Sequence, residues 1–355
     1  MTGAAPPPAA LPCRTDPEEL PVAEHDRQVH VDRNLALELV RVTEAAGLAA
    51  SRWMGRGDKN AADGAAVEAM RKAFDTVAIS GTVVIGEGEM DEAPMLYIGE
   101  KVGLYAKAGG GPEVDIAVDP LEGTTITAKG GPNAMACVAL AQRGGFLHAP
   151  DVYMEKIAVG PGLPDGVVHI DASVEENLKN LALAKKCEIT DLVVCLLDRD
   201  RHKDIVKRAR AAGARIMMIP DGDVSGVVAV SQADTGVDIY MGSGGAPEGV
   251  LAAAALRCIG GQMQGKLLFE NDEQVARARE MGIIDPNRVY GLEDMAKGDV
   301  MFAATGVTTG PMLRGVRTVP GGAITHSIVM RSKSGTVRYV EGHHNFALKP
   351  AAFQG

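Results

Sequence analysis

One stretch decides the fold of this 355-residue chain, Val114-Asp-Ile-Ala-Val-Asp-Pro-Leu-Glu-Gly-Thr-Thr125. Its first five residues predict a buried β-strand. We expect the strand to end at Pro120, because proline has no N–H to donate to a sheet. Gly123 tolerates the positive φ of a sharp turn. The strand therefore delivers three reactive side chains into one small volume, those of Asp119, Glu122 and Thr124.

The two carboxylates of this turn repel each other unless a cation lies between them. Hard carboxylate oxygens suit Mg²⁺ or Mn²⁺. The hydroxyl of Thr124 can then orient a nucleophile toward a bound phosphate, or itself act as one. The alternative is an ordinary Asp-Pro turn with solvated acids.

Composition limits the class of protein. With 46% hydrophobic residues, the chain can bury a large core, and its length favours two domains. No apolar run is long enough to span a bilayer and no signal-peptide pattern is present, so we expect a soluble cytoplasmic protein with no membrane partner. A net charge of −10 argues against nucleic acid as a partner.

The N-terminal part predicts a disordered extension over residues 1–29 and then two helices. Asp32 is a plausible N-cap for a helix over 33–54. Asp63 lies near the start of the second helix, where it could be an N-cap or a metal ligand. Glu87 lies between two glycines that allow close approach to a ligand, so it is a further metal-ligand candidate, with Glu89 behind it.

Strands are predicted over 134–140 and 153–159, followed by a hinge at Gly160-Pro-Gly162. Next come three strand-loop-helix units, whose strands cover 192–197, 215–219 and 238–241. This repetition predicts an α/β fold with a doubly wound, mostly parallel sheet, which binds ligands at the carboxyl ends of its strands.

The three loops at those strand ends carry candidate binding residues. Arg199, Arg201 and His202 could bind a phosphate or be solvated charges. Asp221 and Asp223 could accept hydrogen bonds from sugar hydroxyls or form a turn. The glycine-rich run 242–249 could bind phosphate at a helix N-terminus or be a tight turn, and its Glu248 could be a metal ligand or a helix-start charge.

The C-terminal part predicts a strand over 300–305 and a hairpin over 323–331 and 336–339, with His343 and His344 at the surface. We divide the chain into a metal-binding α+β domain over 30–160, an α/β substrate domain over 161–345 and a tail over 346–355.

Several motifs in order, between about Arg33 and His344, resemble the bacterial class II fructose-1,6-bisphosphatases. Asp119-Pro-Leu-Glu-Gly-Thr124 is also similar to the metal-binding signature of the lithium-sensitive, inositol-monophosphatase-like phosphatases. The further motifs are Gly55-Arg-Gly-Asp-Lys-Asn60, Ala62-Asp-Gly-Ala-Ala66, Val84-Ile-Gly-Glu-Gly-Glu89, Ala93-Pro-Met-Leu-Tyr97, Tyr153-Met-Glu-Lys156, Pro220-Asp-Gly-Asp223 and Gly244-Gly-Ala-Pro-Glu-Gly249.

The resemblance implies a two-domain layered α/β/α/β/α sandwich that hydrolyses the 1-phosphate of D-fructose 1,6-bisphosphate, using two or more Mg²⁺ or Mn²⁺ ions. The implied metal ligands are Asp63, Glu87, Asp119, Glu122 and Glu248. The implied substrate-binding residues are Glu122, Gly123, Thr124, Tyr153, Arg199, Asp200, Arg201, Asp221, Gly222, Asp223 and Gly245. Thr124, Asp63 and Glu87 would be catalytic.

Some alternatives stay open. Glu122 stands where the wider superfamily usually has Asp, which leaves the number of ions undetermined. The substrate could instead be sedoheptulose 1,7-bisphosphate or an inositol phosphate. A non-catalytic sugar-phosphate-binding regulator is the alternative outside enzymes, although such a protein would not need the acid cluster. We also expect a homo-oligomer, a dimer or a tetramer.

Overall fold

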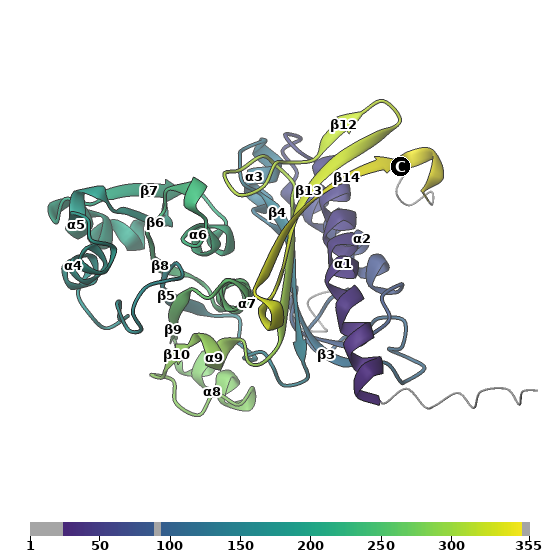
Figure 1. Ribbon diagram of the computed structural model, residues 1–355, viewed down its shortest axis with the longest axis horizontal. Coiled ribbons are helices and arrows are strands. Elements are labelled where there is room, and N and C mark those ends of the chain that lie inside the picture. Colours follow the sequence, from purple (N-terminus) through teal and green to yellow (C-terminus); the bar gives the residue numbers. More distant parts are fainter. Residues whose placement is uncertain (1–23, 89–93, 350–355) are drawn as a thin grey trace, which may run out of the picture.

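The computed structural model describes residues 24–88 and 94–349, which form a layered α/β/α/β/α sandwich (Figure 1). Two helices cover the outer face of the first sheet, α1 (Glu24–Ser51) and α2 (Lys59–Phe74). Two lie between the sheets, α6 (Asp223–Ala229) and α7 (Ala246–Ile259). Two cover the far face of the second sheet, α4 (Val174–Lys185) and α5 (Lys203–Ala211). The predicted layered fold is confirmed.

The first sheet is built from both ends of the described chain. Its strand order is β12-β13-β11-β4-β3-β1-β2, with β14 paired to β13. β1 and β3 are parallel, and the other pairs are antiparallel. The bounds are β1 Ser80–Ile85, β2 Lys101–Val102, β3 Glu113–Glu122, β4 Met135–Gln142, β11 Val300–Gly306, β12 Arg317–Val319, β13 Gly322–Arg331 and β14 Thr336–Asn345.

Both faces of the central strands are buried, and side-chain size decides what packs on each face. On β3, Ile116 and Val118 face α1 and α2, whereas Ala117 faces the central layer. β4 repeats this alternation, with Val138 and Leu140 on the outer face. Small side chains on the inner face leave room for α7, whose own residues 252–255 are four fully buried alanines. The continuous apolar runs in the sequence thus correspond to strands that are covered on both faces of the sheet.

The second sheet has the strand order β10-β9-β5-β8-β6-β7. Its bounds are β5 Tyr153–Val159, β6 Val193–Leu197, β7 Arg215–Ile219, β8 Ile239–Gly245, β9 Gln262–Leu268 and β10 Val289–Gly291. The three predicted strand-loop-helix units do give the parallel strands β8, β6 and β7. β5, β9 and β10 come from outside this repeat and pair antiparallel. The sheet is therefore mixed rather than mostly parallel.

The chain crosses between the sheets at different places from those predicted. β5, residues 153–159, belongs to the second sheet, although the predicted boundary at 160 puts it in the first domain. Residues 300–345 return to the first sheet, although they fall in the predicted second domain. A hydrophobic pattern identifies a strand, but it does not say which sheet the strand joins.

Two elements also begin or end at residues other than those predicted. α1 begins at Glu24, ahead of the predicted cap Asp32, and β3 runs past Pro120 to Glu122. The predicted disordered extension over 1–29 is wrong for residues 24–29, which form the start of α1. Its residues 1–23, residues 350–355 of the predicted tail, and Glu89 lie outside the described residues.

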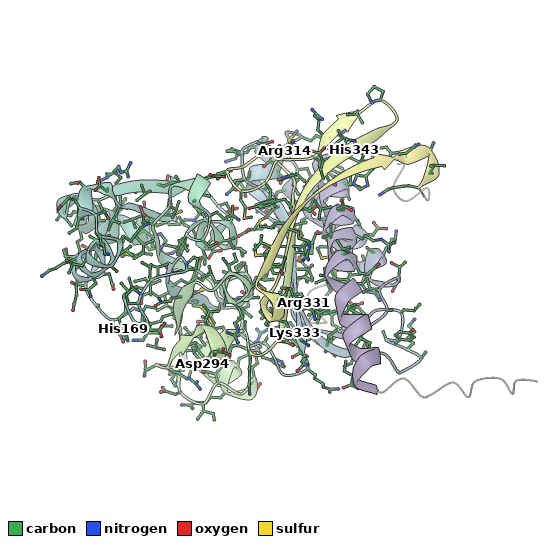
Figure 2. The ribbon with its side chains drawn as sticks, in the orientation of Figure 1. His169, Asp294, Arg314, Arg331, Lys333 and His343 are labelled. Carbon is green, nitrogen blue, oxygen red and sulfur yellow. The ribbon has the colours of Figure 1, made fainter. Side chains whose placement is uncertain are left out.

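The sequence predicts that two histidines near the end of the chain lie at the surface. His343, on β14, is exposed as predicted (Figure 2), but His344 is partly buried, with its side chain 7% exposed and its Nε2 3.5 Å from Glu44. No helix within the described ranges is long and apolar enough to cross a membrane.

Candidate active site

A β-bulge shapes the end of β3. Asp119 pairs with Cys137 of β4, but the next paired residue, Glu122, faces Met135, so β3 carries one extra residue. Pro120 lies within this bulge, where its missing N–H interrupts no regular ladder, and the strand continues instead of stopping. Gly123 follows with φ of 89°, and the short helix α3 (Thr124–Lys129) begins directly after it.

Asp63 is not the helix cap that its position suggests. Asp58 caps α2, accepting a hydrogen bond from the backbone N–H of Ala61 at 2.9 Å. Asp63 lies in the next turn, where its carboxylate has no capping role. The structure thus favours the functional interpretation of Asp63.

A cavity of about 340 Å³ collects the predicted acids. Its lining draws on α2, the loop after β1, the end of β3 and the starts of α6 and α7. All the predicted metal ligands lie there, together with other predicted residues and one further acid, Asp151. The functional side chains and backbone positions of this lining are Asp63, Glu87, Asp119, Glu122, Gly123, Thr124, Asp151, Asp221, Gly222, Asp223 and Glu248.

The carboxylates are close enough to shift one another's pKa values. Burial raises the pKa of Glu87 to about 8, with the charges of Asp63 and Glu248 adding to the effect. Burial, and then Glu122 and Glu87, hold the pKa of Asp119 well above its usual range. Buried acids with raised pKa values are typical of functional sites that hold a cation.

Two oxygens of this cavity have no hydrogen-bond partner among the described residues, Oε2 of Glu122 and Oε2 of Glu248. Both of these oxygen atoms are buried, and an unpartnered buried carboxylate oxygen is costly unless a cation contacts it. A set of carboxylate oxygens fits a hard divalent cation such as Mg²⁺ or Mn²⁺. Across residues 24–88 and 94–349, no three Asp, Glu, His or Cys side chains already have the arrangement of ligands to one ion. The fit therefore rests on the chemistry and burial of the donors.

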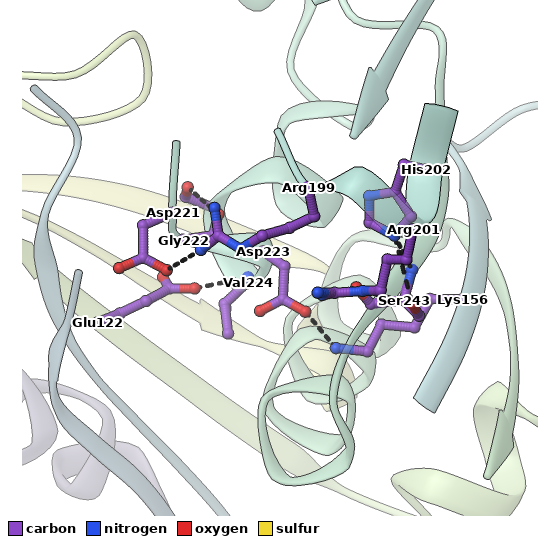
Figure 3. A network of polar contacts seen from close by, with 11 residues as sticks. Glu122, Lys156, Arg199, Arg201, His202, Asp221, Gly222, Asp223, Val224 and Ser243 are labelled. Carbon is purple, nitrogen blue, oxygen red and sulfur yellow. Dashed lines mark hydrogen bonds and ion pairs between the residues drawn. The ribbon is translucent and has the colours of Figure 1, made fainter. Parts of the chain in front are cut away.

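Beside the cavity, a polar network joins the loops of the second sheet (Figure 3). Arg199 donates from Nη1 to the carbonyl oxygen of Pro220 at 2.6 Å, and its Nη2 lies 3.5 Å from Oδ1 of Asp221. Glu122 accepts a hydrogen bond from the backbone N–H of Val224 at 2.6 Å. Glu122 thereby connects the bulge of β3 to the start of α6, and Arg199 contacts the loop that precedes α6.

Arg201 is held in a fixed orientation by Ser243. Its Nε donates to Oγ of Ser243 at 2.9 Å, its Nη2 donates to the Ser243 carbonyl at 2.6 Å, and its guanidinium lies 4.7 Å from the ring centroid of Tyr153. The Ser243 N–H in turn donates to Nε2 of His202 at 2.8 Å, so Nδ1 carries the proton and donates to the Leu197 carbonyl at 2.7 Å. Burial lowers the pKa of His202, which favours this neutral form.

Five predicted substrate-binding residues lie outside the lining of the cavity. Tyr153, Arg199, Arg201 and Gly245 form its surroundings, and a Cβ at position 245 would lie 1.9 Å from Oε2 of Glu248. The structure does not bring Asp200 to the site, because its side chain is 93% exposed and lies 2.9 Å from Lys203.

Sequence reasoning missed Lys156, whose side chain is fully buried and forms an ion pair with Asp223 (Figure 3). The available signal was a lysine within an otherwise apolar strand. It also missed Asp151 and the support that Ser243 gives Arg201.

The family model for bacterial fructose-1,6-bisphosphatase, glpX-encoded, matches residues 33–344. The chain belongs to this family. Among its relatives is the D-fructose 1,6-bisphosphatase class 2/sedoheptulose 1,7-bisphosphatase of Synechococcus sp. (strain JA-2-3B'a(2-13)), which is 46% identical over 335 residues, covering 88% of this chain and 96% of the relative. The protein of the same name from Synechococcus elongatus is 46% identical over 337 residues, covering 89% and 97%.

Membership of the glpX family confirms the predicted class of enzyme. The chain is a bisphosphatase of carbohydrate metabolism, and its family is one of metal-dependent phosphatases. The acid cavity is the part of the molecule whose chemistry suits that reaction.

Proposed function

We propose that this chain hydrolyses the 1-phosphate of D-fructose 1,6-bisphosphate at the acid cavity, giving fructose 6-phosphate and phosphate, a step of gluconeogenesis. One observation carries the assignment of the site. Carboxylates from both halves of the chain line a single cavity, where burial and mutual repulsion raise their pKa values. Within the part of the chain that the structure describes, two of their oxygens lack hydrogen-bond partners.

The proposed metal ligands are Asp63, Glu87, Asp119, Glu122 and Glu248, which would hold two or more Mg²⁺ or Mn²⁺ ions. When bound, such ions neutralise phosphate charge, lower the pKa of a water molecule and stabilise the leaving oxygen.

Thr124 begins α3 at the edge of the cavity, and its side chain is only partly buried. We assign its hydroxyl to the nucleophilic step, either orienting the attacking water or attacking phosphorus itself. The bond from phosphorus to the C1 oxygen breaks as the new bond forms, and the C1 oxygen takes a proton from solvent as fructose 6-phosphate leaves. If Thr124 itself attacks, a water molecule then hydrolyses the phosphothreonine and restores the hydroxyl. Asp63 and Glu87 would take up the proton that the nucleophile loses. No hydrogen bond joins Thr124 to Asp63 among the described residues, so any such contact belongs to the substrate complex.

The 6-phosphate would bind Arg199, which lies beside Asp221, and Arg201, whose guanidinium lies over the ring of Tyr153. Asp221, Gly222 and Asp223 would contact the sugar between the two phosphates. Binding energy gained at the remote phosphate would align the 1-phosphate for attack.

Phosphate release from fructose 1,6-bisphosphate, with and without EDTA, tests the proposal. We expect release that stops on chelation and returns with Mg²⁺ or Mn²⁺, with fructose 6-phosphate as the sugar product. Metal-independent binding without phosphate release would instead favour a regulator.

A second substrate, sedoheptulose 1,7-bisphosphate, is favoured by the names of the relatives, which include both activities. The same carboxylates and arginines would serve a sugar that is longer by one carbon. Comparison of kcat/KM for the two bisphosphates and an inositol monophosphate would decide the preference.

We further propose that the chain belongs to the lithium-sensitive, inositol-monophosphatase-like superfamily, acts in the cytoplasm and assembles as a dimer or tetramer. Inhibition by millimolar Li⁺ tests membership of the superfamily. Fractionation of the source cells tests the cytoplasmic location, and light scattering tests the oligomeric state.

A further inference from the structure

Lys156 occupies a position that a lysine seldom occupies. It lies within β5 among buried apolar neighbours such as Met154 and Ile157, and its side chain is 0% exposed. A buried ammonium is costly unless a partner compensates its charge. Its burial therefore requires a specific partner, whose identity indicates what the lysine does.

That partner is Asp223, at the start of α6. The ammonium donates to Oδ2 of Asp223, whose side chain is only 7% exposed. Among the described residues, this carboxylate is the one hydrogen-bond acceptor of Lys156. Asp223 also lines the acid cavity, so the ion pair connects a buried strand to the substrate side of the site (Figure 3).

Two glycines beside the pair have little room for a side chain of their own. A Cβ at Gly244 would lie 2.0 Å from Oδ2 of Asp223 and 3.3 Å from Nζ of Lys156. A Cβ at Gly249 would lie 3.1 Å from Cε of Lys156. Two glycines of the run 242–249 thus accommodate this ion pair, which gives the run a purpose besides binding phosphate.

The pair also lies close to Glu248. Burial and Asp223 raise the pKa of Glu248, and Lys156 acts in the opposite direction. Lys156 could therefore act on the sugar side of the site through Asp223, or on the metal side through Glu248. The hydrogen bond favours Asp223, because within residues 24–88 and 94–349 only that carboxylate contacts the ammonium directly.

We propose that Lys156 is a positioning residue, whose buried ammonium fixes the Asp223 carboxylate in the orientation that accepts hydrogen bonds from the sugar hydroxyls of the substrate. This inference rests on the proposed function, because it takes the sugar phosphate to occupy the acid cavity. Lys156 itself does not touch the substrate.

The test compares Lys156→Met, Asp223→Asn and the double variant with the wild-type chain. Lys266→Met is the matched control, because Lys266 lies on the neighbouring strand β9 and pairs with Asp171 at 3.2 Å, outside the site. For each protein we would measure KM and kcat for fructose 1,6-bisphosphate, the Mg²⁺ concentration for half-maximal activity, the inhibition constant of inorganic phosphate and the melting temperature.

We expect Lys156→Met to raise KM by about tenfold, while the Mg²⁺ requirement and phosphate inhibition, which do not involve sugar hydroxyls, stay within about twofold of wild type. The double variant should match Asp223→Asn alone, because Lys156 acts through Asp223. It also keeps the test valid if Lys156→Met fails to fold, since it leaves no unpaired buried charge. The Lys266→Met control should retain wild-type kinetics.

An unchanged KM in Lys156→Met would overturn the proposal. The proposal would also fail if the effects of Lys156→Met and Asp223→Asn on KM multiplied in the double variant. A raised Mg²⁺ requirement with KM unchanged would show instead that Lys156 acts on the metal ligands. Wild-type protein that releases no phosphate from fructose 1,6-bisphosphate would refute the proposed function instead, so the two failures are distinguishable.

Discussion

Glu122, at the end of β3, accepts a hydrogen bond from the backbone N–H of Val224, which lies 102 residues further along the chain at the start of α6. This bond uses one oxygen of the carboxylate and joins the first sheet to the central layer. The other oxygen, Oε2, has no partner among the described residues. Glu122 thus has two separable roles, one in folding and one in the acid cavity.

The first prediction separates these roles. Glu122→Gln keeps an oxygen that can accept from Val224 but removes the charge. In the absence of metal, we expect Glu122→Gln to melt at or above the wild-type temperature, because one of the mutually repelling buried carboxylates has lost its charge. We expect its kcat/KM to be lower by about 100-fold. Calorimetry and phosphate release would measure the two effects.

Glu122→Ala is the matched comparison. It removes the acceptor as well as the charge and leaves the Val224 N–H unpaired, so it should unfold more easily than Glu122→Gln by about 1–3 kcal/mol. Equal stability of the two variants would contradict the structural role, and near wild-type activity of Glu122→Gln would remove Glu122 from the metal site.

The second prediction concerns pH. The pKa of Glu87 is raised to about 8 in the folded chain, mainly by burial. Between its unfolded value near 4.5 and about 8, the folded state binds more protons than the unfolded state, so metal-free protein should lose stability as pH rises through this window. The loss from this group is at most about 1.4 kcal/mol per pH unit.

Melting curves with EDTA at pH 5 to 8.5 would show this loss, and Glu87→Gln should flatten the profile. Added Mg²⁺ should restore stability most at the alkaline end, where the ligands are ionised. A metal-free profile that rises with pH throughout would contradict the buried acid cluster.

The sequence predicted five acids as candidate metal ligands, and the structure places all five in the lining of one cavity. For Asp63 and Glu248 that prediction depended on the family motifs, because position alone left each of them open as a helix-start charge or cap. Asp119 and Glu122 flank a proline at a strand end, and Glu87 lies between two glycines. The layered fold also followed from the alternation of strands and helices together with the family motifs. The ion pair of Lys156 with Asp223 did not follow, because it depends on how β5 packs beside α6 across 67 residues of sequence.

The bulge in β3 and the path of the chain between the sheets could not be predicted, because both depend on strand pairing between residues far apart in the sequence. Pro120 normally ends a strand, but a bulge lets β3 continue to Glu122, and only the register with β4 reveals the bulge. The return of residues 300–345 to the first sheet depends on pairing with β4, a strand more than 150 residues earlier, which no local pattern encodes.

The third prediction concerns Thr124. Thr124→Ala should lose most of its turnover, by about 100-fold or more, while binding Mg²⁺ as the wild type does, because the hydroxyl acts on the nucleophile and is not among the carboxylate ligands. Thr124→Ser keeps a hydroxyl and should retain far more activity. Titration calorimetry with Mg²⁺ and steady-state kinetics would measure both. Near wild-type turnover of Thr124→Ala would exclude Thr124 from the mechanism.

The last prediction concerns Arg201, which Ser243 holds against Tyr153 with two hydrogen bonds. If this guanidinium binds the 6-phosphate, Arg201→Ala should raise KM for fructose 1,6-bisphosphate by about tenfold or more, with a smaller effect on kcat. Fructose 1-phosphate, which lacks the remote phosphate, should be hydrolysed equally by variant and wild type.

Arg208→Ala is the control, because Arg208 lies on α5 and forms an exposed ion pair with Glu175, away from the cavity. It should leave both substrates unaffected. An unchanged KM for the bisphosphate in Arg201→Ala would place the 6-phosphate elsewhere. Equal losses on the two substrates would show that Arg201 supports the cavity as a whole, because an arginine that binds only the remote phosphate cannot influence a substrate without one.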